Sequence, residues 1–260
     1  NRGAIFVEEI EEIPNDSLVI FSAHGVSSKV EEETKSRNLN FFDATCPLVT
    51  KVHMEVRKHA NAEKDIILIG HEGHPEVEGT MGRHVNSANS SIYLVQDEDD
   101  ALSINVNKEN QLAVVTQTTL SVDETKSIIS ILKNRFPEIL IPKKDDICYA
   151  TQNRQDAVKQ LALESDFMIV VGSKNSSNSN RLKELGEKCG CKSVLIDEFN
   201  DLDIKSLSNY SRISITAGAS APESRVMEIA KSLESYIGAK IIEHGEDNEN
   251  IYFKLPPGLR

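Results

Sequence analysis

Two stretches of this chain, each about a hundred residues long, follow the same plan. Gly70 follows Cys46 by 24 residues, and Gly172 follows Cys148 by 24 residues. In each copy an amphipathic segment and a short apolar run lie between the cysteine and the glycine, and a small polar loop comes about 70 residues after the cysteine. Because the copies start 102 residues apart, the repeat unit has the size of a small domain and not of a solenoid repeat.

The beginning of the chain contains the end of a third copy. The apolar run 18–21 leads into the polar loop 22–25 and then into a helical pattern, as in the last third of each complete copy. The start of this copy, with a cysteine of its own, is expected upstream of Asn1. We therefore predict four parts, which are the remainder of a first domain at 1–45, a second domain at 46–143, a third domain at 144–240 and a C-terminal tail at 241–260.

Short apolar runs alternate with amphipathic segments along the whole chain. Strands are predicted at 18–21, 66–69, 92–95, 112–115, 167–171, 194–196 and 213–215, and helices at 28–37, 48–62, 122–136, 152–164, 179–188 and 223–237. Such alternation is typical of parallel sheets covered by helices, so the predicted fold class is α/β. The acidic patch at 97–100 is predicted to be a solvated turn.

The charge balance limits the partners that the chain can bind. It has 41 acidic side chains against 29 lysines and arginines, a formal net charge of −12. Nucleic acids and anionic membrane surfaces are bound through Lys and Arg, so neither is an expected partner. No apolar run approaches the roughly 20 residues that cross a bilayer. Four cysteines are too few for a disulfide scaffold, which favours a reducing compartment.

Cys46 and Cys148 occupy matched settings. Each follows acidic residues and opens a predicted helix, and Pro47 suits a first helical position. A thiol at a helix N-terminus is biased toward thiolate, the form that binds metals. Two such thiolates and an inferred third are one short of the four that saturate a 4Fe–4S cluster, so one iron would stay open. Buried, inert cysteines are the alternative. Ordinary loop thiols are expected at Cys189 and Cys191, with a metal-binding or redox pair as the alternative there.

Polar loops follow several predicted strands, which is where ligand sites of α/β proteins lie. The loop 71–76 contains His74, which could bind an anion or a metal, and Glu76, which could move a proton. A polar turn without function is the alternative. His24 lies in the corresponding loop of the partial copy. The remaining histidines are expected on helix surfaces or in loops, namely His53, His59, His84 and His244.

The loop 172–180 is rich in hydroxyl and amide groups and precedes a helix. It could bind a phosphate through backbone N–H groups and hydroxyls, or it could only cap the helix. It lacks the Gly-Lys-Ser/Thr ending of a P-loop, so nucleotide hydrolysis is not indicated.

Ser220 and Glu223 fit a capping box, so Ser220 could cap a helix, bind a ligand or do both. Thr118 and Thr119 share this ambiguity. Together the loops predict a phosphorylated anion held mainly by neutral donors and histidines.

Six motifs identify a family. They are DATCPLVTKVH (43–53), HPEVEGT (74–80), TQTTLS (116–121), CYATQNRQ (148–155), GSKNSSNSNRL (172–182) and TAGASAP (216–222). In their residues and their order along the chain, the motifs resemble those of the 4-hydroxy-3-methylbut-2-enyl diphosphate reductases, the LytB family. These enzymes catalyse the last step of the methylerythritol phosphate route to isoprenoids. The resemblance extends over the whole chain.

The resemblance implies three small α/β domains related by a pseudo-threefold axis around a central iron–sulfur site, the first being incomplete here. Cys46 and Cys148 would bind a 4Fe–4S cluster, whose third cysteine ligand is expected upstream of residue 1, as is a further diphosphate-binding histidine. Glu76 would deliver a proton, aided by Thr118. The substrate-binding residues implied by the resemblance are His24, His74, Thr118, Ser176, Ser177, Asn178 and Ser220.

The implied reaction is a two-electron reductive dehydroxylation of an allylic diphosphate to isopentenyl diphosphate and dimethylallyl diphosphate. Its electrons would come from a ferredoxin or a flavodoxin, in the cytoplasm of a bacterium or in the plastid of a plant or alga. Two alternatives remain. A metal-dependent phosphohydrolase would use His71, His74 and Glu76 with a divalent ion, although these loops are rich in Ser and Asn. A non-enzymatic iron–sulfur sensor would need an output module, and none is visible in the sequence.

Overall fold

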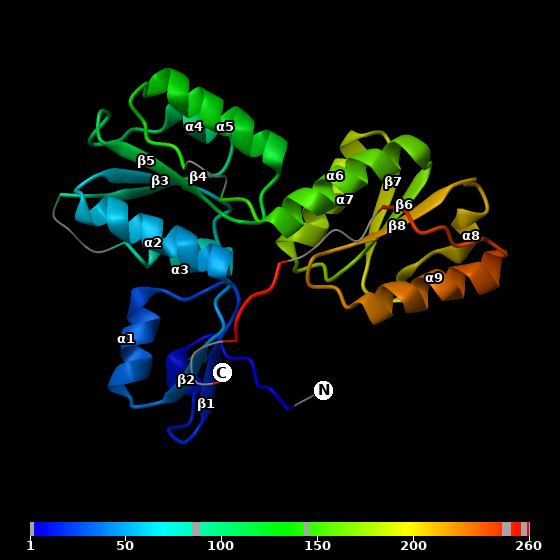
Figure 1. Ribbon diagram of the computed structural model, residues 1–260, viewed down its shortest axis with the longest axis horizontal. Coiled ribbons are helices and arrows are strands. Elements are labelled where there is room, and N and C mark those ends of the chain that lie inside the picture. The colour runs from blue at the N-terminus through cyan, green and yellow to red at the C-terminus, as the bar shows by residue number, and fades with distance from the viewer. Residues whose placement is uncertain (1–2, 85–88, 143–145, 246–250, 256–258, 260) are drawn as a thin grey trace. The chain divides into compact units, whose positions relative to one another are not determined.

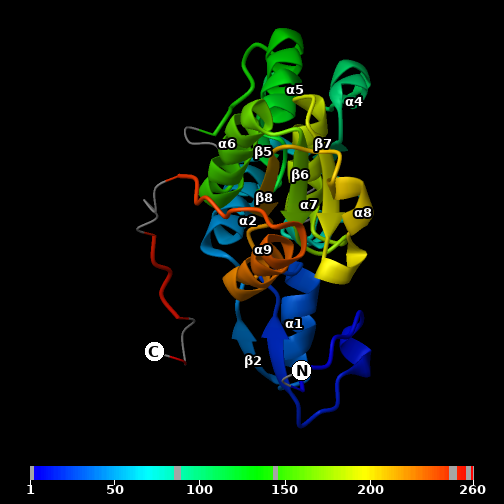
Figure 2. The same ribbon diagram turned by 90° about the vertical axis from the view of Figure 1, so that its right-hand side faces the viewer.

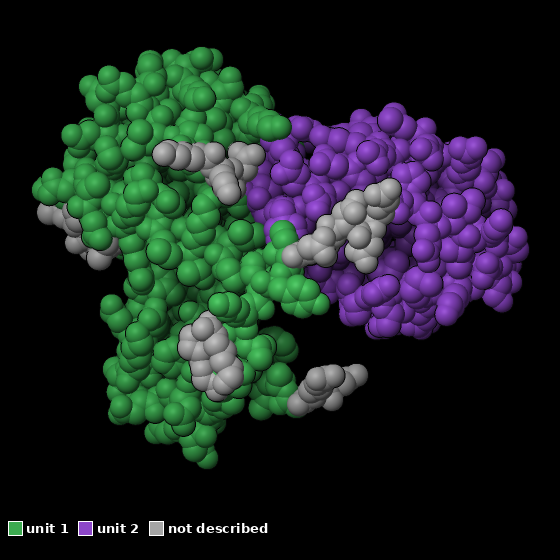
Figure 3. Space-filling model, viewed as in Figure 1, with its two compact units in different colours: residues 1–118, 124–146, 251–260 green, residues 119–123, 147–250 purple. Residues whose placement is uncertain are grey.

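The computed structural model describes residues 3–84, 89–142, 146–245, 251–255 and 259. The chain divides into two compact units (Figure 3). Unit 1 comprises Asn1–Thr118, Glu124–Asp146 and Ile251–Arg260, and unit 2 comprises Thr119–Asp123 and Ile147–Asn250. The predicted domain boundaries at residues 45, 143 and 240 stay a prediction.

Unit 1 contains two parallel sheets (Figure 1). One pairs β1 (Leu18–Phe21) with β2 (Asn40–Asp43), and the other has the order β4-β3-β5, with β3 at Asp65–Ile69, β4 at Ile92–Val95 and β5 at Leu112–Thr116. The helices of unit 1 are α1 (Ser28–Ser36), α2 (Pro47–Asn61), α3 (Pro75–Met81), α4 (Glu98–Ser103) and most of α5 (Val122–Arg135), with a short 3-10 helix at Ile10–Glu12. Helices α2 and α3 cover one face of the three-stranded sheet, and α4 and α5 cover the other.

Unit 2 contains one parallel sheet of the order β7-β6-β8 (Figure 2). Its strands are β6 (Phe167–Val171), β7 (Lys192–Ile196) and β8 (Ile213–Ala217). Its helices are α6 (Tyr149–Glu164), α7 (Ser177–Lys188), α8 (Ile204–Leu207) and α9 (Glu223–Ile237), with a short 3-10 helix at Phe199–Asp201. The strand order matches that of the three-stranded sheet in unit 1, because in both sheets the first strand lies between the second and the third.

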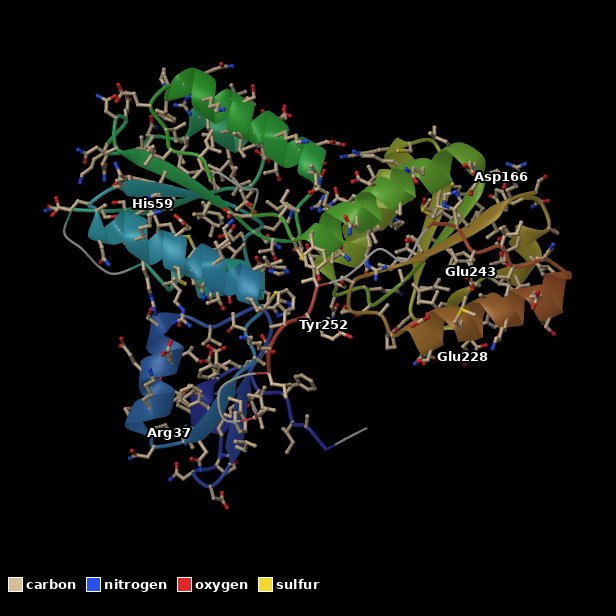
Figure 4. All side chains as sticks on the ribbon, viewed as in Figure 1. Arg37, His59, Asp166, Glu228, Glu243 and Tyr252 are labelled. Carbon is tan, nitrogen blue, oxygen red and sulfur yellow. The ribbon has the colours of Figure 1, made fainter. Side chains whose placement is uncertain are left out.

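The central strands of the two matched sheets, β3 and β6, are buried along their whole length. Both faces of a parallel sheet are covered, so such strands have continuous apolar sequences and not alternating ones. Val52 and Val56 of α2 pack on β3, and Val158 of α6 packs on β6. Asp166, labelled in Figure 4, precedes β6 and accepts backbone N–H groups just before β8, which aligns the two strands.

The structure confirms an α/β fold with parallel sheets flanked by helices. Strand β2 and helices α3, α4 and α8 were not predicted, and α6 begins three residues earlier than expected. The acidic patch at 97–100 is largely exposed, as predicted, but it begins a helix and is not a turn. The side chain of Asp97 accepts the N–H of Asp100 at 2.9 Å and caps α4, because an aspartate before a helix satisfies N–H groups that have no partner within the helix. Within the described parts of the chain, no helix has the length and apolar character needed to span a membrane.

Candidate active site

The two matched cysteines are the N-caps of long helices, as the sequence predicted. Cys46 precedes α2 and Cys148 precedes α6, with nearly equal backbone angles (φ −54°, ψ 132° and φ −60°, ψ 133°). Neither side chain caps its helix, and both thiols are free and partly buried. The backbone N–H of Cys46 donates to the carbonyl of Ala23 at 3.0 Å, which ties this cysteine to the loop that contains His24.

The other two cysteines have different surroundings. Cys189 is the exposed C-cap of α7, and Cys191 is buried in the core between β6 and α6. Burial raises the pKa of the Cys191 thiol, so this side chain stays neutral and packs as an apolar group. The expectation that neither cysteine is a cluster ligand stays a prediction.

His74 is held as a neutral hydrogen-bond donor. It is the N-cap of α3, a helix that the sequence analysis took for a loop, and Pro75 occupies the first helical position. The Nδ1 atom of His74 accepts the backbone N–H of Glu76 at 3.1 Å, so the ring proton lies on Nε2. Burial, and then the charges of His24 and His71, lower the pKa of His74 to about 4. At neutral pH the His74 ring is therefore uncharged, and its Nε2–H group can donate a hydrogen bond.

His24 lies beside His74. Their ring centroids are 5.5 Å apart and the rings meet edge to face. His24 is exposed and follows β1, whereas His74 follows β3, so two loops of unit 1 place imidazole rings together. Two imidazoles from separate loops can donate to neighbouring oxygens of one anion.

Glu76 is a buried acid whose carboxyl group is held by Thr118. Glu76 is 2% exposed, its Oε1 accepts the backbone N–H of Thr118 at 2.6 Å, and its Oε2 accepts the Thr118 hydroxyl at 3.1 Å. Burial raises the pKa of Glu76 to about 7, although the two hydrogen bonds from Thr118 act in the opposite direction. A carboxyl group with this pKa can give up a proton at neutral pH, as general acid catalysis requires.

The loop before α7 has unused hydrogen-bonding capacity in unit 2. Ser176 caps α7 by accepting the N–H of Ser179 at 3.3 Å, so capping is part of its role, and Ser177 accepts the hydroxyl of Thr119 at 3.3 Å. Asn178 is 5% exposed, yet within the described residues neither its Oδ1 nor its Nδ2 has a hydrogen-bond partner. Buried polar groups are nearly always paired, so this loop fits a polar ligand that both donates and accepts.

Ser220 does not cap the helix that follows it. Helix α9 begins at Glu223 with Pro222 as its N-cap, and no side chain caps it. The capping box predicted for Ser220 and Glu223 is therefore wrong, because the helix begins two residues later than such a box requires. The side chain of Ser220 is exposed at the carboxyl end of β8, which leaves ligand binding as the remaining prediction for this residue.

The sequence analysis missed two buried polar residues near the carboxyl ends of the strands in the three-stranded sheet of unit 1. Gln117 is 1% exposed and accepts the backbone N–H of His71 at 3.1 Å, which joins the loop after β5 to the loop after β3. Asp146 has no exposed side-chain surface and accepts from the Lys51 ammonium at 2.9 Å and from the Thr116 N–H at 3.2 Å. Burial raises the pKa of Asp146, against the effect of Lys51. A polar residue at the end of an apolar strand is the signal that could have drawn attention to Gln117.

His53 is also placed differently from the expectation. It was predicted to lie on a helix surface or in a loop, but it is 5% exposed and faces the loop after β1. Burial, and then the charges of Arg83 and Arg57, lower its pKa to about 4. The helical periodicity of α2 alone could not show this, because the loop that covers His53 is distant in sequence.

The atoms that a divalent-metal phosphohydrolase would need are already engaged. His74 Nδ1 accepts from the backbone, and both carboxyl oxygens of Glu76 accept from Thr118. Nowhere in the described parts of the chain do three or more His, Cys, Asp or Glu side chains form a metal-binding group. The predicted set of His71, His74 and Glu76 is therefore not assembled as a metal shell.

Comparison with known proteins gives concordant matches. The family model described as LytB protein matches residues 1–234. A protein from Alcanivorax borkumensis named 4-hydroxy-3-methylbut-2-enyl diphosphate reductase is 56% identical over 259 residues, and the match covers 100% of this chain and 83% of that protein. A protein of the same name from Pseudomonas putida is 56% identical over 260 residues, covering 100% of this chain and 82% of the relative.

Two solved structures resemble this one. The E-1-hydroxy-2-methyl-but-2-enyl-4-diphosphate reductase from Plasmodium falciparum superposes with a TM-score of 0.91 at 37% sequence identity, covering 98% of this chain and 79% of that chain. A second structure, described as (E)-4-hydroxy-3-methyl-but-2-enyl diphosphate reductase, the terminal enzyme of the non-mevalonate pathway, gives a TM-score of 0.59 at 28% identity. It covers 88% of this chain and 79% of that chain.

Proposed function

Because this chain belongs to the LytB family, we propose that it reduces 4-hydroxy-3-methylbut-2-enyl diphosphate to isopentenyl diphosphate and dimethylallyl diphosphate. This is the terminal step of the non-mevalonate route to isoprenoids. The allylic C–O bond breaks, two electrons and two protons enter, and one water leaves. The observation that carries the proposal is the buried acid Glu76, held by Thr118 next to the neutral donor His74.

The cysteines fit an iron–sulfur cofactor. Cys46 and Cys148 have free, partly buried thiols at helix N-termini, with matched backbone conformations, and neither thiol is used as a cap. Thiolates are the usual ligands of such clusters. We propose that these two residues bind a 4Fe–4S cluster, and the repeat predicts a third cysteine ligand upstream. When bound, the cluster supplies electrons one at a time and a Lewis-acidic iron.

We propose that neutral donors hold the diphosphate group. The Nε2–H group of His74 is free to donate because Nδ1 is occupied, and His24 lies beside it. In unit 2, the unpaired amide of Asn178 has both a donor and an acceptor to offer. The proposed diphosphate-binding residues are His24, His74, Ser176, Ser177, Asn178 and Ser220, and Thr118 completes the proposed substrate-binding set.

Glu76 is proposed to protonate the leaving hydroxyl group. Hydroxide is a poor leaving group, whereas water leaves readily once the oxygen has received a proton. The pKa of about 7 keeps a proton on a large fraction of the Glu76 carboxyls at neutral pH. Thr118 holds both carboxyl oxygens and so fixes the direction in which that proton is delivered.

The two electrons require a partner. We propose a ferredoxin or a flavodoxin, since these carry single electrons at low potential and each turnover needs two. A reducing cytoplasm is the proposed location, because the similar proteins from Alcanivorax borkumensis and Pseudomonas putida are bacterial and all four cysteines of this chain are free.

The experiment is an anaerobic assay of the full-length, cluster-loaded protein with 4-hydroxy-3-methylbut-2-enyl diphosphate and a chemical one-electron reductant. Products are identified by mass spectrometry. We expect isopentenyl and dimethylallyl diphosphate, with two electrons consumed for each substrate. Release of inorganic phosphate or pyrophosphate without reduction would instead indicate a hydrolase.

A further inference from the structure

The residue seven positions after each matched cysteine faces a loop that carries proposed substrate contacts. His53 follows Cys46 by seven residues, and Gln155 follows Cys148 by seven. Both side chains are buried, at 5% and 2% exposure. Neither has a part in the proposed chemistry, so their burial and their common position in the repeat call for an explanation.

Gln155 binds the loop that follows β5. Its Nε2 donates to the carbonyl of Leu120 at 2.8 Å, and its Oε1 accepts the N–H of Val122 at 3.0 Å. The side-chain amide therefore pairs with a donor and an acceptor of the backbone, as a neighbouring strand would. Thr119 directly precedes Leu120, and its hydroxyl donates to Ser177 at 3.3 Å.

His53 packs against the loop that follows β1. A Cβ atom at Gly25 would lie 2.5 Å from Cε1 of His53, so the imidazole fills the space that a side chain would need. Gly25 has φ +78°, which glycine adopts without strain. A Cβ atom at Gly79 would lie 3.0 Å from the Gly25 carbonyl oxygen. The loop is thus packed closely against both α2 and α3, and His24 directly precedes Gly25.

The two contacts are equivalent in the repeat. Gly25 is the fourth residue after the end of β1, and Leu120 is the fourth after the end of β5. Each loop therefore lies in the last third of one copy, and the helix that follows the next cysteine contacts it. Each contact lies within one unit, the His53 contact in unit 1 and the Gln155 contact in unit 2.

We propose that His53 and Gln155 are positioning residues of the reductase, through which each cysteine-bearing helix orients the substrate loop of the preceding copy. This inference rests on the proposed function, because that function makes His24 and Thr118 substrate contacts. The amide of Gln155 makes two hydrogen bonds. Nε2 of His53 has no hydrogen-bond partner among the described residues, so its ring positions the loop by packing. The stronger effect is therefore expected at Gln155.

The first test replaces Gln155 with Met, which keeps the length of the side chain and removes both hydrogen bonds. The control is Gln152→Met, an exposed glutamine on the same helix. In the full-length, cluster-loaded protein, Gln155→Met should retain the cluster absorption spectrum and speed hydrogen exchange at the Val122 amide by about tenfold or more. A displaced loop should lower kcat/KM by roughly 10- to 100-fold, with Gln152→Met unchanged.

Two outcomes overturn the proposal. One is a folded, cluster-loaded Gln155→Met protein with wild-type kcat and KM, and the other is unchanged exchange at Val122. If Gln155→Met does not fold, the kinetics of Gln155→Glu decide, since this variant keeps the acceptor for Val122 and loses the donor to Leu120. A folded, cluster-loaded Gln155→Glu protein with wild-type kcat and KM would then overturn the proposal. A wild-type protein that does not reduce the substrate would refute the proposed function instead, whatever the exchange at Val122.

The second test is made at the other copy. His53→Ala should open space beside Gly25 and raise KM severalfold through displacement of His24, while Val122 exchange stays at the wild-type rate. His53→Gln introduces the glutamine that the other copy has at this position, Gln155, and should recover part of the kcat/KM that His53→Ala loses. Wild-type kinetics in a folded His53→Ala protein would remove His53 from the proposal.

Discussion

The backbone N–H and the hydroxyl of Thr118 donate to the two carboxyl oxygens of Glu76, at 2.6 Å and 3.1 Å. Both bonds favour the carboxylate, whereas burial favours the neutral acid, and burial prevails, so the pKa rises to about 7. Thr118 follows β5 and Glu76 lies in α3, which comes directly after β3. The pairing of these two strands therefore places a proton donor where a ligand can reach it.

The rate of substrate reduction should fall as pH rises through about 7, because Glu76 acts in its protonated form and its carboxyl group loses that proton above its pKa. Thr118→Val removes a hydrogen bond that lowers this pKa, so the falling limb should move to higher pH. The measurement is kcat against pH with saturating substrate and reductant. A limb that stays in place or moves to lower pH in Thr118→Val would contradict the assignment.

The four cysteines should separate into two classes. Cys46→Ser and Cys148→Ser should lose stable iron binding and turnover, since each removes a proposed cluster ligand. Cys189→Ser and Cys191→Ser should keep both, because these residues lie outside the repeated positions. Iron content and the absorption spectrum of anaerobically purified protein decide this. Loss of iron in either of the second pair would be evidence against the assignment.

Asn178→Leu should weaken substrate binding without destabilising the fold. The buried amide has no partner among the described residues, so an apolar side chain of similar size removes unpaired polar atoms and leaves the thermal midpoint equal or higher. The dissociation constant of the diphosphate substrate should rise at least tenfold.

The matched control is Asn180→Leu on the same helix. The Asn180 amide donates to the carbonyls of Lys174 and Ser176 at 2.8 and 2.9 Å, so its loss should lower the thermal midpoint. If Asn178→Leu destabilises the protein as much as Asn180→Leu and leaves binding intact, Asn178 is a structural residue.

Lys51→Met should destabilise the protein by about 2–3 kcal/mol, because it leaves the fully buried side chain of Asp146 without its ammonium partner. The comparison is Lys58→Met. Lys58 pairs with Glu55 at the surface and is 68% exposed, so its loss should change the free energy of unfolding by less than about 0.5 kcal/mol. Urea denaturation of both variants measures the difference. Equal effects would show that Asp146 does not depend on Lys51.

The sheets could be predicted from sequence because β3 and β6 are buried on both faces and have continuous apolar sequences. Helix α3 could not, since it spans only Pro75–Met81 and contains Gly79, which weakens a helical pattern. Strand β2 was missed because it has polar residues at both ends and forms half of a two-stranded sheet.

The candidate site was predicted as a set of residue types and not as an arrangement. Glu76 and Thr118 were both named, but their contact depends on strand pairing across 42 residues. Gln155 was not named at all, although it lies in the quoted motif 148–155, because its role depends on a loop more than thirty residues away. Long-range contacts of this kind leave no periodic signal in the sequence.

The role of Glu76 as proton donor is tested most directly by a single-turnover measurement on Glu76→Gln. This variant keeps the size of the side chain and removes the proton. With the cluster and the substrate affinity both retained, product formation from reduced enzyme should be slower than wild type by roughly 10²–10⁴-fold. A wild-type rate in a cluster-loaded, substrate-bound Glu76→Gln enzyme would contradict the claim that Glu76 protonates the leaving hydroxyl group.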